Sequence, residues 1–188
     1  MARPKSEDKR EAIMAAATKI FAAQGLSAPT AIIAKEAGVA NGSLFNYFQT
    51  KADLLNQLYL ELKTEMAAVS LTGLPTESDI KHQLFYMWSR WLEWATSYPD
   101  KRRTLTYLGV SDEITPASHH AGSQAMAGIA RLLERSRENG PMQDAPLGFV
   151  VSLMTALAEA TIDYMVQDPA NAKNHCKVGF DAMWRIVA

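Results

Sequence analysis

Residues 38–48 read "GVANGSLFNYF", a stretch in which a flexible Asn-Gly pair stands directly before four bulky aliphatic or aromatic side chains. Asn-Gly is typical of a tight hairpin turn and is a poor pair inside a helix. The preceding residues 34–40 lack the alternation of a strand, so a hairpin is disfavoured. Gly38 instead fits a left-handed helix C-cap. The stretch therefore predicts two short helices, at about 30–37 and 41–47, joined by a tight turn.

Two short helices joined in this way have the anatomy of a helix-turn-helix, whose second helix enters the DNA major groove. Four apolar residues would lock the pair together: Ile33, Ala34, Val39 and Leu44. Gly42 would let the second helix approach the DNA backbone closely. Asn41, Ser43 and Asn46 offer hydrogen bonds to base edges or phosphates. The same arrangement also occurs in helical proteins for packing alone, so the spacing by itself leaves both interpretations open.

Helical signals continue on both sides of this pair. A run of apolar residues on one face predicts a helix from Ser6 to near Gly25, with Ile13, Ala16, Ala17, Ile20 and Phe21 on that face. Thr50 and Asp53 form a capping box that begins a further helix. Tyr47 can give its hydroxyl to a phosphate, and Lys51 lies in the first turn of that further helix, where backbone N–H groups also face an anion.

The composition is that of a globular protein, since 48% of the 188 residues are hydrophobic. Residues 1–51 carry seven basic and four acidic side chains, whereas the rest of the chain carries 12 basic and 16 acidic ones. A positive end on an acidic body favours a polyanion partner. No signal-peptide pattern and no uninterrupted apolar run of about 18 residues is present. Cys176 is the single cysteine, so no internal disulfide can form. Together these features predict a soluble cytoplasmic protein without membrane contact.

Two segments, "REAIMAAATKIFAAQG" and "IAKEAGVANGSLFNYFQTKADLL", resemble the N-terminal domain of TetR-family transcriptional regulators. The resemblance covers roughly residues 9–60. It implies an all-α fold of about nine helices, with a three-helix helix-turn-helix DNA-binding domain at 1–52 and a helical effector-binding and dimerisation domain at 53–188. At the matching positions it implies DNA contacts from Thr30, Ala40, Asn41, Gly42, Ser43, Asn46, Tyr47 and Lys51.

Three positions depart from the pattern of that family. The loop at 25–32 is one residue shorter, which would place Thr30 at the phosphate-binding cap position. Ala40 stands where the family has a serine or threonine cap, and the lost side-chain cap is worth about 1 kcal/mol. Phe45 replaces the usual tyrosine and cannot hydrogen-bond to a phosphate.

Beyond residue 73, further helix starts are expected at a second capping box from Thr76 to Asp79, at Asp100, at 115–116, at 144–146 and at 168–169. An aromatic stripe over residues 85–94 is more typical of ordinary core than of a pocket, although tryptophan and tyrosine also suit an apolar cavity with polar handles. The resemblance implies an effector pocket in this part of the chain. The candidate ligand contacts for a largely apolar or aromatic small molecule are Trp88, Trp91, Tyr107, Met126, Phe149 and Tyr164.

The last two expected helices carry more apolar surface than one neighbour would cover. In the resembled family this pair forms a four-helix bundle with its copy in a homodimer. The candidate interface residues are Val151, Met154, Leu157, Phe180, Met183 and Trp184. Burial of these residues within one subunit is the alternative.

Metal, cofactor and catalytic patterns are not found. The adjacent His119 and His120 point to different helix faces, so they do not form the i, i+4 pair of a helical zinc site. Cys176 lies on an apolar face and is expected to be a buried, inert thiol. The sequence has no phosphate-binding loop, nucleophile elbow or dinucleotide fingerprint. We therefore predict no metal, no cofactor and no enzymatic activity.

Taken together, the helix-turn-helix spacing, the basic end and the resemblance predict a DNA-binding transcriptional regulator. The expected mechanism is a repressor that binds a palindromic operator as a dimer and is released by a small molecule. An activator of the same class stays open. A different alternative is a helical small-molecule-binding module or enzyme that keeps the helix-turn-helix for packing alone.

Overall fold

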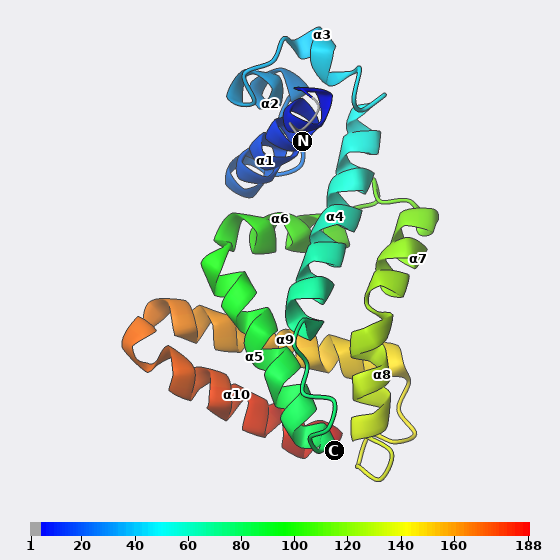
Figure 1. Ribbon diagram of the computed structural model, residues 1–188, viewed down its shortest axis with the longest axis vertical. Helices are drawn as coiled ribbons and strands as arrows, with labels where there is room; N and C mark the ends of the chain where they lie inside the picture. Colours follow the sequence, from blue (N-terminus) through cyan, green and yellow to red (C-terminus); the bar gives the residue numbers. More distant parts are fainter. Residues whose placement is uncertain (1–4) are drawn as a thin grey trace. The chain divides into compact units, whose positions relative to one another are not determined.

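The computed structural model describes residues 5–188, and these residues form an all-α fold (Figure 1). Ten α-helices and one short 3₁₀ turn follow one another in the described residues. They are α1 (Lys5–Gln24), α2 (Thr30–Glu36), α3 (Asn41–Leu44), α4 (Lys51–Leu71), α5 (Ile80–Ser97), α6 (Pro99–Gly109), α7 (Pro116–Ala125), α8 (Ala127–Ser136), α9 (Leu147–Gln167), η1 (Pro169–Asn171) and α10 (Ala172–Val187). The all-α prediction is confirmed.

Packing divides the chain into two compact units. The first contains the chain up to Thr64 together with Tyr98–Gln124, and the second contains Glu65–Ser97 together with Ala125–Ala188. The helix α4 belongs to both, because its first two-thirds pack in the first unit and its last turns in the second. The predicted division at residue 52 concerns where the DNA-binding function ends, and it stays a prediction.

The first unit is built around α1, which lies between α2 and α6 (Figure 1). The apolar face predicted for α1 is confirmed, since Ile13, Ala17 and Phe21 are completely buried. Leu44 and Phe48 enter the same core from residues 41–48, which we call the α3 segment. Leu54 and Leu58 enter it from α4. The buried Thr104 hydroxyl of α6 donates a 2.9 Å hydrogen bond to the Thr18 carbonyl of α1.

The turn between α2 and α3 has the predicted geometry. Gly38 has φ +68°, in the left-handed region that favours glycine. Its N–H donates to the Lys35 carbonyl at 3.2 Å, and the Val39 N–H donates to the Ala34 carbonyl at 2.9 Å. This pair of bonds is a Schellman motif, which satisfies the last carbonyls of α2. The turn therefore fixes the direction in which the chain enters α3.

The α3 segment, residues 41–48, is less helical than predicted. A helix over 41–47 was expected, but α3 ends at Leu44. The chain then continues in turns, in which the Asn46 N–H donates to the Ser43 carbonyl and the Tyr47 N–H to the Leu44 carbonyl. Ala40 caps α3 without a side-chain hydrogen bond. The absence of a cap and the presence of Gly42 both weaken a helix this short.

The capping box at the start of α4 is confirmed in substance. Thr50 Oγ1 accepts a 3.0 Å hydrogen bond from the Asp53 N–H. The Asp53 carboxylate reaches back to the Gln49 N–H at 3.0 Å, one residue before the cap. Because this box fixes the start of α4, it also fixes the position of Lys51 in the first turn.

The second unit packs α5 against α8, α9 and α10. Trp88 of α5 is completely buried, and its Nε1 donates a 3.1 Å hydrogen bond to the Cys176 carbonyl of α10. The rings of Phe85 and Phe180 meet edge to face with centroids 4.9 Å apart. Trp88 and Trp94 of the aromatic stripe are thus core residues, whereas Phe85, Tyr86 and Trp91 are half-buried.

Three predicted boundaries in this part of the chain were wrong. Asp79, not Thr76, caps α5, since its Oδ1 accepts a 2.9 Å bond from the His82 N–H. Tyr98, not Asp100, occupies the cap position of α6, because Pro99 already begins the helix. The segment 116–136 also divides into α7 and α8 at Met126, which gives ten helices instead of about nine.

No uninterrupted apolar run of about 18 residues was expected, and α9 contains none, but this helix is long and apolar enough to cross a membrane by length and composition. An 18-residue stretch within its 21 residues has a mean hydropathy of 1.5, and only 28% of that stretch is buried. The search for an uninterrupted apolar run missed it because serine, threonine and two acidic residues interrupt the helix. By length and composition alone such a helix is weak evidence for a membrane span.

Gly38 provides a direct test of the turn. No atom lies within 4 Å of a Cβ built on Gly38, so the cost of Gly38→Ala comes from the positive φ alone. We expect Gly38→Ala to lower the free energy of unfolding by about 1 kcal/mol in urea titrations. Gly42→Ala is the matched control, because Gly42 has open space and no positive φ, and its unfolding free energy should not fall. Equal losses in both variants would contradict this account of the turn.

Candidate nucleic-acid interface

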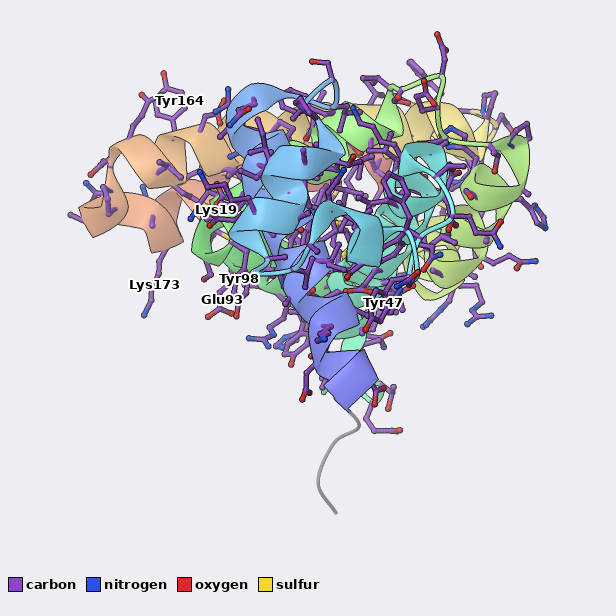
Figure 2. All side chains as sticks on the ribbon, turned by 90° about the horizontal axis from the view of Figure 1, so that it is seen from above. Lys19, Tyr47, Glu93, Tyr98, Tyr164 and Lys173 are labelled. Carbon is purple, nitrogen blue, oxygen red and sulfur yellow. The ribbon has the colours of Figure 1, made fainter. Side chains whose placement is uncertain are left out.

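The α3 segment divides its side chains between the core and the solvent. Leu44 and Phe48 are completely buried. Asn41, Gly42 and Asn46 are exposed, and Ser43 and Tyr47 are half-buried. Tyr47 packs against the core of the first unit (labelled in Figure 2). The buried side chains anchor the segment, and most of its polar side chains are left on an accessible surface.

Two of the predicted contact residues lie at helix starts that have no side-chain cap. Pro29, not Thr30, occupies the N-cap of α2, so Thr30 is the first helical residue and is half-buried. Pro29 takes the cap because its φ of −67° and ψ of 141° suit the entry to a helix. Ala40 is exposed at the cap of α3. Both starts leave backbone N–H groups without a side-chain oxygen, which suits contact with an anion from outside.

The basic side chains of the first unit fall into two groups. Arg10 is engaged, since its guanidinium donates to Glu61 at 3.2 Å and to Gln57 at 3.0 Å. Lys19 is also engaged, because it donates a 2.5 Å hydrogen bond to Glu36, and this bond raises the pKa of its ammonium group. Both side chains therefore stabilise contacts between helices and are not the cations that we assign to a polyanion.

Lys51 belongs to the second group. It is half-buried, with its Nζ 6.0 Å from the centre of the Phe21 ring. Among the described residues no carboxylate forms an ion pair with Lys51. Its ammonium group thus faces an aromatic ring and has no carboxylate partner among the described residues. That combination suits a contact with a phosphate of a nucleic acid.

Gly42 has no explanation within the chain. Its φ is not positive, and a Cβ built on it would meet no atom within 4 Å. Glycine inside a helix is destabilising by about 0.5–1 kcal/mol relative to alanine. Neither backbone strain nor packing within the described residues requires a glycine at this position, and the space beside the α3 backbone is open.

The candidate ligand residues are not gathered into one site. Trp88 is fully buried and hydrogen-bonded, while Trp91 and Met126 are half-buried. Phe149 and Tyr164 of α9 are 52% and 61% exposed. Tyr107 belongs to the first unit, where its hydroxyl accepts a 2.8 Å bond from Arg103 Nε. A surface hollow of about 340 Å³ lies between the start of α5 and α10, lined by Asp79, Lys81, His82, Phe85, Lys177, Phe180 and Asp181. None of the candidate residues lines it.

The candidate dimer residues also divide. Met154, Phe180 and Met183 are 3% exposed or less, so they are core residues of the second unit and are not accessible to another chain. Val151 is exposed, and Leu157 and Trp184 are half-buried. Periodicity placed all six on apolar faces, but these helices bury one side within the subunit and expose the other. Large apolar residues that the sequence analysis did not select are also exposed there: Val166, Val178 and Ile186.

The cysteine and histidine side chains that could carry chemistry are engaged in contacts within the fold. Cys176 is a buried free cysteine, and burial raises the pKa of its thiol, as expected of an inert residue. His175 lies 3.0 Å from the Asp168 carboxylate in the turn between α9 and α10. Within residues 5–188 no group of three histidine, cysteine or acidic side chains is arranged to hold a metal ion.

Sequence reasoning missed one feature of the α3 surface. Phe45 is 41% exposed directly after α3, and Ile32 is 38% exposed on α2. The sequence analysis considered Phe45 only because it lacks the hydroxyl of the usual tyrosine. Neither exposure could be read from the sequence, because the spacing of apolar residues does not tell an exposed aromatic ring from a buried one over so short a helix.

Comparison with known proteins agrees with this geometry. Residues 13–58 match the family model "Bacterial regulatory proteins, tetR family". A tetR-family transcription regulator from Shewanella sp. PV-4 is 27% identical, with a TM-score of 0.84 over 94% of this chain and 96% of that one. A TetR-family regulator from Marinobacter aquaeolei VT8 shares the fold at 19% identity, with a TM-score of 0.79 over 95% and 94% of the two chains.

A third solved structure is the TetR-like transcriptional regulator LfrR from Mycobacterium smegmatis, in complex with proflavine. It shares the fold at 19% identity, with a TM-score of 0.69 over 96% of this chain and 98% of that one. The matched family model covers the two short helices, the turn between them and the start of α4, and the structural likeness extends over nearly the whole chain. Residues 13–58 therefore form a TetR-type helix-turn-helix domain, and the chain as a whole shares the fold of TetR-family transcription regulators.

Proposed function

We propose that this regulator is a ligand-responsive repressor that binds a palindromic operator as a homodimer and is released when a small molecule binds. The observation that carries the DNA contact is Gly42, because open space surrounds it and no feature of the chain requires a glycine there. In a major groove, the missing Cβ lets the α3 backbone approach the DNA.

The proposed contacts follow from exposure. Asn41 and Asn46 are exposed amides that can pair with base edges, and adenine is the base that suits an amide best. Thr30, Ala40, Ser43, Tyr47 and Lys51 are placed to contact phosphates through hydroxyl, backbone N–H or ammonium groups. Two copies of α3 in a symmetric dimer would enter successive major grooves about 34 Å apart. A regulator acting on DNA in this way would work in the cytoplasm.

Gly42→Ala separates stability from function. The unfolding free energy should rise by up to about 1 kcal/mol, since alanine is the better helix former and its methyl group meets no atom of the chain. Affinity for the promoter region beside the gene should nevertheless fall at least tenfold in fluorescence anisotropy, because the methyl group occupies the space that DNA needs. A variant that binds this DNA as tightly as the wild type would sink the proposed role of Gly42.

Lys51→Gln tests the phosphate contact by removing the charge while keeping a long polar side chain. Binding should weaken for all DNA sequences. The slope of log K against log salt concentration should also become shallower by about 0.9 per subunit, the contribution of one phosphate contact. Lys173→Gln, at an exposed site on α10, removes the same charge and should leave the slope unchanged. An unchanged slope for Lys51→Gln would show that this ammonium group contacts no phosphate.

The dimer proposal rests on α9. An 18-residue stretch of α9 has a mean hydropathy of 1.5, and only 28% of it is buried, which leaves a large apolar surface without cover in one chain. Exposed Ala156 and Ala160 lie one turn apart and would allow close approach of a second helix. Val151, Leu157 and the exposed Phe149 would extend this contact along α9. A second copy of the chain is the partner that we propose for this surface.

Ala160→Arg tests this interface without disturbing the core, because Ala160 is exposed. The wild-type protein should sediment at twice the 20.7 kDa mass of one chain. The variant should shift toward the single-chain mass with its helical circular dichroism unchanged. Ser123→Arg, at an exposed site on α7, is the control and should stay dimeric. Sedimentation of the wild type as a monomer would refute the proposed dimer.

The proposed effector is a small, largely apolar or aromatic molecule. The proflavine complex of LfrR supports this chemistry for a protein of the same fold. Trp91 and Met126, both half-buried in the second unit, are the candidate contacts that remain accessible without being fully exposed. To release DNA, the effector must favour the non-binding state, and a coupling of about 1–3 kcal/mol is ordinary for such regulators.

A further inference from the structure

Phe45 is an unusual surface residue. Residues 38–48 contain four bulky side chains. Leu44 and Phe48 are completely buried and Tyr47 is half-buried, but Phe45 is 41% exposed. Its backbone, with φ −73° and ψ −8°, still follows the helical turn at the end of α3. The ring is therefore not part of the core that anchors the segment.

The neighbours of Phe45 are polar or lack a side chain. Asn41 lies four residues before it and is therefore one helical turn away, and Asn46 follows it; both are exposed. Gly42 lies three residues before it and leaves open space. The ring is thus an exposed apolar group in a segment whose other exposed side chains are the amides of the proposed base contacts.

Only one group on the major-groove edges of DNA matches such a ring. Base edges there present hydrogen-bond donors and acceptors, and thymine alone adds an apolar C5-methyl group. We propose that Phe45 packs on the C5-methyl group of a thymine and so specifies thymine at one position in each half of the operator. This inference rests on the proposed DNA-binding function and adds apolar base reading to the hydrogen bonds of Asn41 and Asn46.

The experiment begins with duplexes selected from random DNA by the wild-type protein. Each thymine of the selected site is then replaced singly by deoxyuridine, which pairs identically but lacks the methyl group. At one position per half-site, we expect about fourfold weaker binding, the effect of one buried methyl group. In Phe45→Ala the same replacement should have no effect, because the packing partner of the methyl group is gone. Phe45→Leu keeps an apolar contact and should retain part of the sensitivity.

Ile32→Ala is the matched control, since it removes a similarly exposed apolar side chain from α2. It should keep the full sensitivity to deoxyuridine. Wild-type binding that ignores every methyl removal would overturn the inference and leave the DNA-binding proposal standing. A uniform loss of affinity in Phe45→Ala with no change in methyl sensitivity would also overturn it, because the ring would then lie on the sugar backbone. Failure to select any sequence would overturn the DNA-binding proposal, and this inference with it.

Discussion

The burial of Leu44 and Phe48 is the contact on which the proposed reading surface depends. A helix of four residues, with alanine at its cap and glycine in its first turn, cannot persist by its own hydrogen bonds. Its shape is imposed by these two side chains, which are completely buried in the core that α1 and α4 supply. The polar residues of α3 are therefore held in place by a rigid unit, and little entropy remains to be lost when they meet a partner.

Two glycines four residues apart illustrate how one residue type serves two purposes. Gly38 is required by the backbone, because φ +68° lets the Schellman motif turn the chain sharply into α3. Gly42 is required by neither backbone nor packing in the described residues, and the role proposed for it is a close approach to DNA. The first contributes to stability and the second weakens the helix. Such a local weakness at a surface is typical of a site that function, not folding, has shaped.

The sequence sufficed for features that depend on neighbouring residues. The Gly38 turn, the box at Thr50 and Asp53 and the apolar face of α1 are local patterns, and each was confirmed. The sequence did not suffice where two residues could each cap the same helix, as Thr76 and Asp79 could for α5. Only tertiary packing decides which of them begins the helix. The sequence also could not divide Met154 from Val151, since periodicity marks an apolar helix face but does not say which chain covers it. The exposure of Phe45 belongs to the same class.

The separation of anchor from surface along α3 has an evolutionary consequence. Asn41, Gly42, Phe45 and Asn46 contribute little to the core, so they can be exchanged with little effect on folding. A duplicated copy of such a regulator could drift toward a new set of target promoters through a few substitutions without passing through an unfolded intermediate. The same freedom makes Asn41, Phe45 and Asn46 the natural choice for a library that retargets the protein to a chosen DNA sequence, with Gly42 kept unchanged.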